Sequence, residues 1–191
     1  MAELIAGLLG IAVGFTVLLV LFVVVIYNKL VNLRNTAQSS WSDIDVQLKK
    51  RYDLVPNLVE TVKGYASHEK AVFEKVTEAR SMATQASSPE EKARTENIFR
   101  DTLKSLFAVA EAYPELKANT NFIQLQSQLK ELEDNIESAR RYYNAVVRDL
   151  NTLIESFPSN VIASSFKFQK KEFFGLEAPD VERKPVKVSF Q

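Results

Sequence analysis

The sequence feature that most constrains this chain is a long apolar run near its N-terminus. The run extends from Leu4 to Tyr27 and contains no Asp, Glu, Lys or Arg. A bilayer core is about 30 Å thick and an α-helix rises about 1.5 Å per residue, so a helix over this run is long enough to cross it. We therefore expect residues 1–3 to form a short N-terminal end and residues 4–27 a transmembrane helix.

Two other interpretations of the run fit its residues less well. A cleaved signal peptide has a basic start and an apolar core of about 7–15 residues, whereas this chain begins Met1-Ala2-Glu3 and its apolar run is longer. A buried core helix would usually be shorter and amphipathic. Within the run, Gly10 and Gly14 have the small-xxx-small spacing that lets two spans pack closely, although glycine is also tolerated in lipid without such a role.

The charges that flank the run predict its orientation. Lys29 and Arg34 follow it and Glu3 precedes it, so the positive-inside rule places the N-terminus outside and the rest of the chain in the cytoplasm. The chain has no cysteine, which excludes disulfides and thiolate metal sites. Its 24 Lys and Arg residues balance 24 Asp and Glu residues, so net charge does not favour a nucleic-acid partner.

The remainder of the chain has the pattern of an all-α protein. Glycine is scarce, and apolar residues recur every three or four positions, as on one face of a helix. We expect residues 28–158 to form an up-and-down antiparallel bundle whose last helix returns toward the membrane. Four helices are predicted, and the last has a stripe sustained over about five heptads, as in coiled coils; their ranges are 28–64, 68–86, 89–112 and 120–157.

Local signals set the predicted helix ends. Ser88-Pro89-Glu90-Glu91 has the form of a capping box with proline at the first helical position. Gly64 suits a left-handed helix end, and Ser67 suits the cap of the following helix. If the helix instead continues through Gly64, the bundle has three helices. Pro56 lies inside the first helix, where we expect a kink.

Residues 159–175 mix aromatic and basic side chains, and two interpretations of this segment stay open. The phenylalanines and lysines could contact lipid headgroups beside the span, or the phenylalanines could close the open end of the bundle. The candidate lipid-contact residues are Phe166, Lys167, Phe168, Lys170, Lys171, Phe173 and Phe174. Residues 176–191 are expected to form an extended tail.

The sequence contains few of the residue patterns that catalysis requires. His68 is the single histidine, too few for a di-iron bundle, and no glycine-rich phosphate loop is present. The acidic residues Glu131, Glu133, Asp134 and Glu137 wrap around their helix and are interpreted as a solvated face. We therefore expect no enzyme activity, no catalytic residue, no cofactor and no metal.

Four polar residues are predicted to lie together between the first and last long helices. Arg51, Asp53, Arg140 and Asn144 are candidates for a structural cluster that fixes how these helices pack. A ligand-binding role for the four residues is the less favoured interpretation.

The order and spacing of several motifs resemble the LemA family of bacterial membrane proteins over nearly the whole chain. The strongest motif is Arg51-Tyr52-Asp53-Leu54-Val55-Pro56-Asn57-Leu58, and others include Asn121-Phe122, Tyr143-Asn144 and Phe157-Pro158. The resemblance implies a single-pass protein of the bacterial inner membrane with a cytoplasmic helical bundle. It supplies no activity, because none is established for the family, and a magnetosome-membrane relative suggests membrane organisation.

Two function hypotheses follow. The leading one is a membrane-anchored, non-enzymatic scaffold that self-associates or docks a membrane-associated partner protein. The alternative is a lipid-binding or membrane-shaping module that acts through the aromatic and basic C-terminal segment. Both require the lipid bilayer as a partner, and neither requires nucleic acid.

Overall fold

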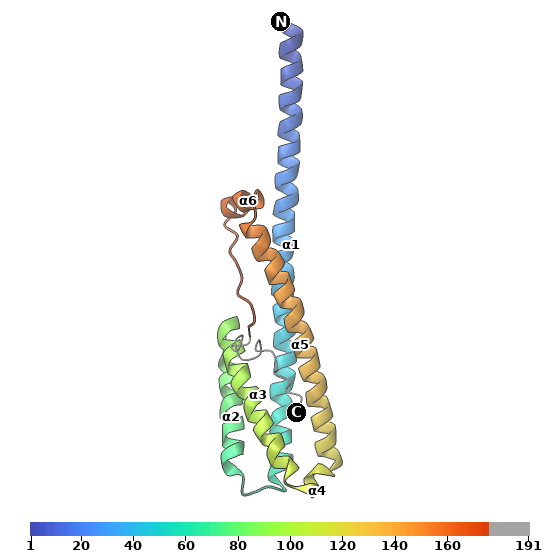
Figure 1. Ribbon diagram of the computed structural model, residues 1–191, viewed down its shortest axis with the longest axis vertical. Coiled ribbons are helices and arrows are strands. Elements are labelled where there is room, and N and C mark those ends of the chain that lie inside the picture. Colours follow the sequence, from blue (N-terminus) through green and yellow to red (C-terminus); the bar gives the residue numbers. More distant parts are fainter. Residues whose placement is uncertain (176–191) are drawn as a thin grey trace, which may run out of the picture. The chain divides into compact units, whose positions relative to one another are not determined.

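The computed structural model describes residues 1–175, and the regular structure in that range is entirely helical (Figure 1). The all-α prediction is confirmed. The predicted tail over 176–191 lies outside the described residues. In chain order the helices are α1 (Ala2–Lys63), α2 (Lys70–Gln85), α3 (Pro89–Glu111), α4 (Pro114–Lys117), α5 (Thr120–Glu155) and α6 (Ser159–Ser165).

The chain divides into two compact units. Unit 1 contains Met1–Trp41 and Tyr142–Lys171, and unit 2 contains Ser42–Arg141 and the segment that begins at Glu172. Helices α1 and α5 each contribute residues to both units. The predicted division into a span, a bundle, a C-terminal segment and a tail stays a prediction.

Unit 1 begins with the apolar part of α1, which is long and apolar enough to cross a membrane. Its side chains are exposed along the whole predicted span, apart from the half-buried Val23 and Ile26 near its end. Because burying apolar surface is the main driving force of folding, a bare apolar helix of this length calls for lipid or other apolar helices around it.

The core of unit 1 lies just beyond this bare segment. Leu30 of α1, Leu150 of α5 and Ile162 and Ala163 of α6 form a buried cluster. Val23 and Ile26 pack against the same cluster, so the end of α5 and all of α6 lie beside the end of the apolar run. Within this unit, the end of the last long helix therefore lies beside the end of the apolar run.

Unit 2 contains the second part of α1, then α2, α3 and α4, and the first part of α5. Helices α2 and α3 lie side by side, and α4 turns the chain between α3 and α5 (Figure 1). Helix α1 ends at Lys63, so the four-helix prediction is confirmed against the three-helix alternative. The apolar side chains fully buried in this unit include Ile44, Leu48, Val55, Leu58, Val62, Val76, Phe99, Leu106 and Leu116.

The predicted start of α3 is confirmed. The Ser88 hydroxyl accepts a hydrogen bond from the Glu91 backbone N–H at 3.1 Å, and Pro89 occupies the first turn. The Glu91 carboxylate in turn accepts from the Ser87 N–H at 3.1 Å, one residue earlier than the capping box predicts.

The predicted turn after α1 is wrong in two details. Gly64 does not adopt the left-handed conformation, because the Tyr65 and Ala66 N–H groups both donate to the Val62 carbonyl, at 3.0 and 2.9 Å, and close the helix with a right-handed turn. Ser67 does not cap α2, which begins later, at Lys70, with Glu69 in the capping position and no side-chain capping bond.

Candidate functional site

A buried ion-pair cluster lies at the centre of unit 2. Arg51 of α1 is 2% exposed, and its guanidinium pairs with Glu96 of α3, which is 6% exposed, and with Glu133 of α5. The ring of Phe99 lies 5.2 Å from the guanidinium carbon. Because desolvating a charge is costly unless it is paired, Arg51, Glu96 and Glu133 hold three helices in one register.

Tyr52 joins this cluster from the next position of α1. Its hydroxyl donates to the Glu96 carboxylate, and its ring packs edge-on to Phe99 with 5.7 Å between ring centres. Burial raises the pKa of Tyr52 to about 12, against a smaller lowering by the Arg51 charge. The neutral phenol is therefore the form that the folded chain favours.

This pKa gives a direct test of the cluster. Because the folded-state pKa is raised, the contribution of Tyr52 to stability is complete below pH 10 and is lost as the pH rises from about 10 to about 12. Titration of phenolate absorbance, with circular dichroism checking that the fold persists, should show a component near pH 12. Tyr52→Phe should remove that component. A Tyr52 component centred near pH 10 would show that the hydroxyl is solvated.

The proline beside the cluster is compensated by an arginine. Helix α1 continues through Pro56, which has no N–H to donate to the Tyr52 carbonyl four residues earlier. The Nε–H of Arg80 in α2 donates to that carbonyl at 2.6 Å. The proline in the strongest sequence motif thus leaves an acceptor that ties α2 to α1.

The four residues predicted to form a polar cluster have different environments. Arg51 is the buried centre, whereas Asp53 is exposed. Arg140 stacks on the buried ring of Phe174 with 4.6 Å from its guanidinium carbon to the ring centre. Burial lowers the pKa of Arg140, and the charges of Arg100 and Arg51 lower it further. Asn144 belongs to unit 1.

Two members of the cluster were missed by sequence reasoning. Glu96 lies three residues before Phe99 and seven before Leu103, so it sits on the buried stripe of α3, and a carboxylate on an apolar stripe was the available signal. Glu133 was assigned to a solvated acidic face. The structure corrects that assignment, because Glu133 is half-buried and pairs with Arg51, a partner 82 positions away.

The charged groups of the cluster pair with one another. Glu96 accepts from both Arg51 and Tyr52, and Glu133 accepts from Arg51. Within residues 1–175, no group of three or more His, Asp or Glu side chains is placed to hold a metal ion. This geometry fixes helix packing.

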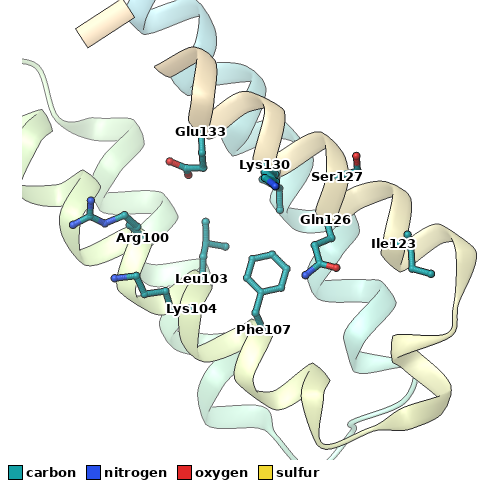
Figure 2. Close-up of a pocket in the computed structure, with 10 residues that line it drawn as sticks. Arg100, Leu103, Lys104, Phe107, Ile123, Gln126, Ser127, Lys130 and Glu133 are labelled. Atoms are coloured by element: carbon teal, nitrogen blue, oxygen red, sulfur yellow. The ribbon is translucent and has the colours of Figure 1, made fainter. Parts of the chain in front are cut away.

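An apolar groove between α3 and α5 is the second feature of unit 2. Leu103 and Phe107 of α3 point into the space that faces α5 (Figure 2). Ile123 and Leu129 of α5 complete its apolar lining. The groove has a volume of about 530 Å³. Its polar and charged lining residues are Arg100, Lys104, Gln126, Ser127, Lys130 and Glu133.

The aromatic and basic segment of the chain is divided between the two units. Phe168 is half-buried against the unit 1 core, and Arg34 lies 5.4 Å from the centre of its ring. Phe166 is exposed, although its ring contacts Tyr27 with 4.7 Å between ring centres. Phe173 is exposed, and Phe174 is buried in unit 2 under Arg140.

The three lysines of this segment differ in their contacts. Lys170 forms an ion pair with Glu155 of α5. The Lys171 backbone N–H donates to the Asn151 side-chain oxygen at 3.0 Å, and the Asn151 amide donates back to the Lys171 carbonyl at 2.9 Å. Lys167 is exposed and has a positive φ of 56°. The segment is therefore pinned to α5 through Asn151.

Comparison with known proteins decides the family. The model of the LemA family matches residues 40–190, which is most of the chain. The chain belongs to the LemA family. Protein LemA of Metamycoplasma hominis is 27% identical over 166 residues, which cover 85% of this chain and 74% of that protein.

Magnetosome proteins also match this LemA family chain. Magnetosome proteins MamQ 1 and MamQ 2 of Paramagnetospirillum magneticum are each 25% identical to it over 174 residues. The match covers 78% of this chain and 64% of each MamQ protein, so it spans less than two thirds of their length. The family match includes the ion-pair cluster, the groove and the C-terminal segment, whereas the apolar run over 4–27 precedes it.

Proposed function

We propose that this LemA family chain is a membrane-anchored, non-enzymatic scaffold of the bacterial inner membrane that docks another protein chain through the α3–α5 groove. The occupant we propose is an amphipathic segment with apolar residues in the groove and acidic residues beside them. A second copy of the chain and a different membrane-associated protein are both sources of such a segment.

The observation that carries this proposal is the composition of the groove. Its four apolar lining residues run along two helices, which is the geometry that accepts a helix in helix-in-groove recognition. Arg100 on α3 and Lys130 on α5 add positive charge beside these residues. Lys104 also lines the groove, but it is already paired with Asp101 at 3.1 Å. An occupant with acidic flanks is therefore favoured by charge complementarity.

Anchoring of the scaffold rests on the exposed apolar part of α1. Every side chain from Leu4 to Phe22 is exposed, so the segment needs an apolar environment that the described residues do not provide. Lys29 and Arg34 beyond it support an outside N-terminus and a cytoplasmic unit 2, by the positive-inside rule.

Two isoleucines with similar exposure provide a matched test of docking. Ile123 lines the groove, whereas Ile98 is on α3 outside the groove lining. Ile123→Glu should lower the yield of cross-linked chain pairs in membranes at least about tenfold, because it places an unpaired carboxylate against the apolar part of the occupant. Ile98→Glu should leave the yield unchanged.

The measurement is cross-linking of the full chain in membranes, with mass measurement of the products in lipid nanodiscs. Products that contain two copies identify self-association, and products of mixed mass identify a different partner. Equal effects of the two glutamates, or a strictly monomeric chain with no cross-linked product, would contradict docking through the groove.

A further inference from the structure

A second interaction surface lies in unit 1, at the C-terminal end of the apolar run. We infer that the α6 foot, which we define as Phe157, Val161 and Phe166, inserts into the lipid interface, and that a basic pocket beside it binds the headgroup of an anionic phospholipid. The inference rests on the anchoring part of the proposed function, because it requires the apolar run of α1 to lie in a bilayer.

Packing places α6 at the level where the apolar run ends. Ile162 and Ala163 are buried against Leu30, and Val23 and Ile26 of the run flank the same cluster. Tyr27, the last residue of the run, contacts the ring of Phe166. Tyrosine at the end of a span is typical of the membrane–water interface, so α6 and Phe166 are held at interfacial depth.

The foot exposes apolar side chains at this level. Phe157 is 83% exposed, Val161 57% and Phe166 53%. Single exposed apolar residues are ordinary on a protein surface, but here three lie within ten residues beside a candidate span. Because α6 buries Ile162 and Ala163 toward the protein, it is an amphipathic segment of the type that lies in the interface.

A basic pocket lies on the same segment. It has a volume of about 450 Å³ and is lined by three α1 residues, Arg34, Asn35 and Gln38, and by residues 167–171. Lys170 is paired with Glu155, so the positive charge of the pocket comes from Arg34, Lys167 and Lys171. The Lys171 ammonium also donates to the Gln38 side-chain oxygen at 3.5 Å. Anionic lipid headgroups attract such clusters, and the amide of Asn35 supplies a further donor.

The pocket is preformed rather than a loose set of surface lysines. Asn151 fixes the backbone of Lys171 through two hydrogen bonds. Phe168, three residues before Lys171, packs on the unit 1 core, and the Arg34 guanidinium lies over its ring. These contacts divide the predicted lipid-contact residues. Phe166 and Lys167 are exposed beside the end of the run, whereas Lys170 and Lys171 bond to Glu155 and Gln38. Phe168 and Phe174 support the fold, and Phe173 is exposed in unit 2. Phe157 and Val161 are new members of the lipid-contact set.

The absence of cysteine makes a depth measurement simple. We would place a single nitroxide label on the full chain at Val161→Cys, with Val17→Cys inside the apolar run and Val46→Cys in unit 2 as references. All three valines are about half exposed. The chains are reconstituted in nanodiscs of phosphatidylcholine with 0 or about 30% phosphatidylglycerol, a composition that brings the surface potential into play.

Collision rates with oxygen, which partitions into lipid, and with a water-soluble nickel chelate report the depth of each label. The oxygen-to-nickel ratio at Val161 should lie between the ratios at Val17 and Val46 and should rise when phosphatidylglycerol is added. Lys167→Glu with Lys171→Glu should abolish the rise and leave the ratio at Val17 unchanged.

The outcomes separate the two proposals. A lipid-like ratio at Val17 with a Val46-like ratio at Val161 would overturn the foot and leave the anchor standing. A water-like ratio at Val17 would overturn the anchor and the foot together. A lipid-like ratio at Val161 that ignores phosphatidylglycerol and the two glutamates would overturn the headgroup pocket and support the apolar contact.

Discussion

Arg51→Met should lower the free energy of unfolding by about 3–5 kcal/mol, because it leaves Glu96 buried with no cation beside it. A domain of this kind is stable by only about 5–15 kcal/mol, so the variant should be close to unfolding at room temperature. Urea unfolding of the full chain in detergent, followed by circular dichroism, measures the change as a lower midpoint.

We expect the loss of stability to come from leaving Glu96 buried without its partner, and not from removing a positive charge as such. Arg51→Met combined with Glu96→Leu replaces both members of the buried pair by apolar side chains, and it should recover a large part of the lost stability. Glu133 then loses Arg51 but is half-exposed, and the Tyr52 hydroxyl keeps the Ala83 carbonyl as an acceptor at 3.4 Å. Arg141→Met is the exposed control, since Arg141 pairs with Glu137 on the surface of α5 and should cost under about 1 kcal/mol. A loss below about 1 kcal/mol in Arg51→Met would show that Glu96 is satisfied without Arg51.

The helices themselves were predictable because their signals are local. The spacing of apolar residues along α5 and the capping box at Ser88 act within a few turns of chain, and both match the structure. The end of α1 was placed within one residue, although through a different hydrogen-bond pattern at Gly64. Periodicity and capping require no knowledge of what a helix packs against.

The partners within the site were less predictable because they are distant in sequence. Arg51 meets Glu96 and Glu133 only after three helices have packed, and Arg80 meets the Tyr52 carbonyl across 28 positions. Composition marked Phe166–Phe174 as one aromatic and basic segment. Which phenylalanines turn inward was decided by contacts with Arg34 and Arg140, which are tertiary.

The second large effect concerns the anchor. Phe15→Arg combined with Leu18→Arg should prevent stable insertion of α1, because each arginine near the centre of a span costs about 2.5–3.5 kcal/mol on the insertion scale. Both side chains are exposed in unit 1, so the substitutions remove no packing in the described residues. Alkaline extraction of membranes should leave the original chain in the pellet and release the double variant.

A control separates the effect of adding charge from the effect of changing these two side chains. Phe15→Leu with Leu18→Phe exchanges the two side chains, keeps the run apolar and should remain in the pellet. Retention of the double-arginine variant in the pellet would contradict this prediction, because the apolar character of the run would then not be what holds the chain in the membrane. Release of the unmodified chain would contradict the anchor itself, because a helix this apolar is then covered by protein rather than by lipid.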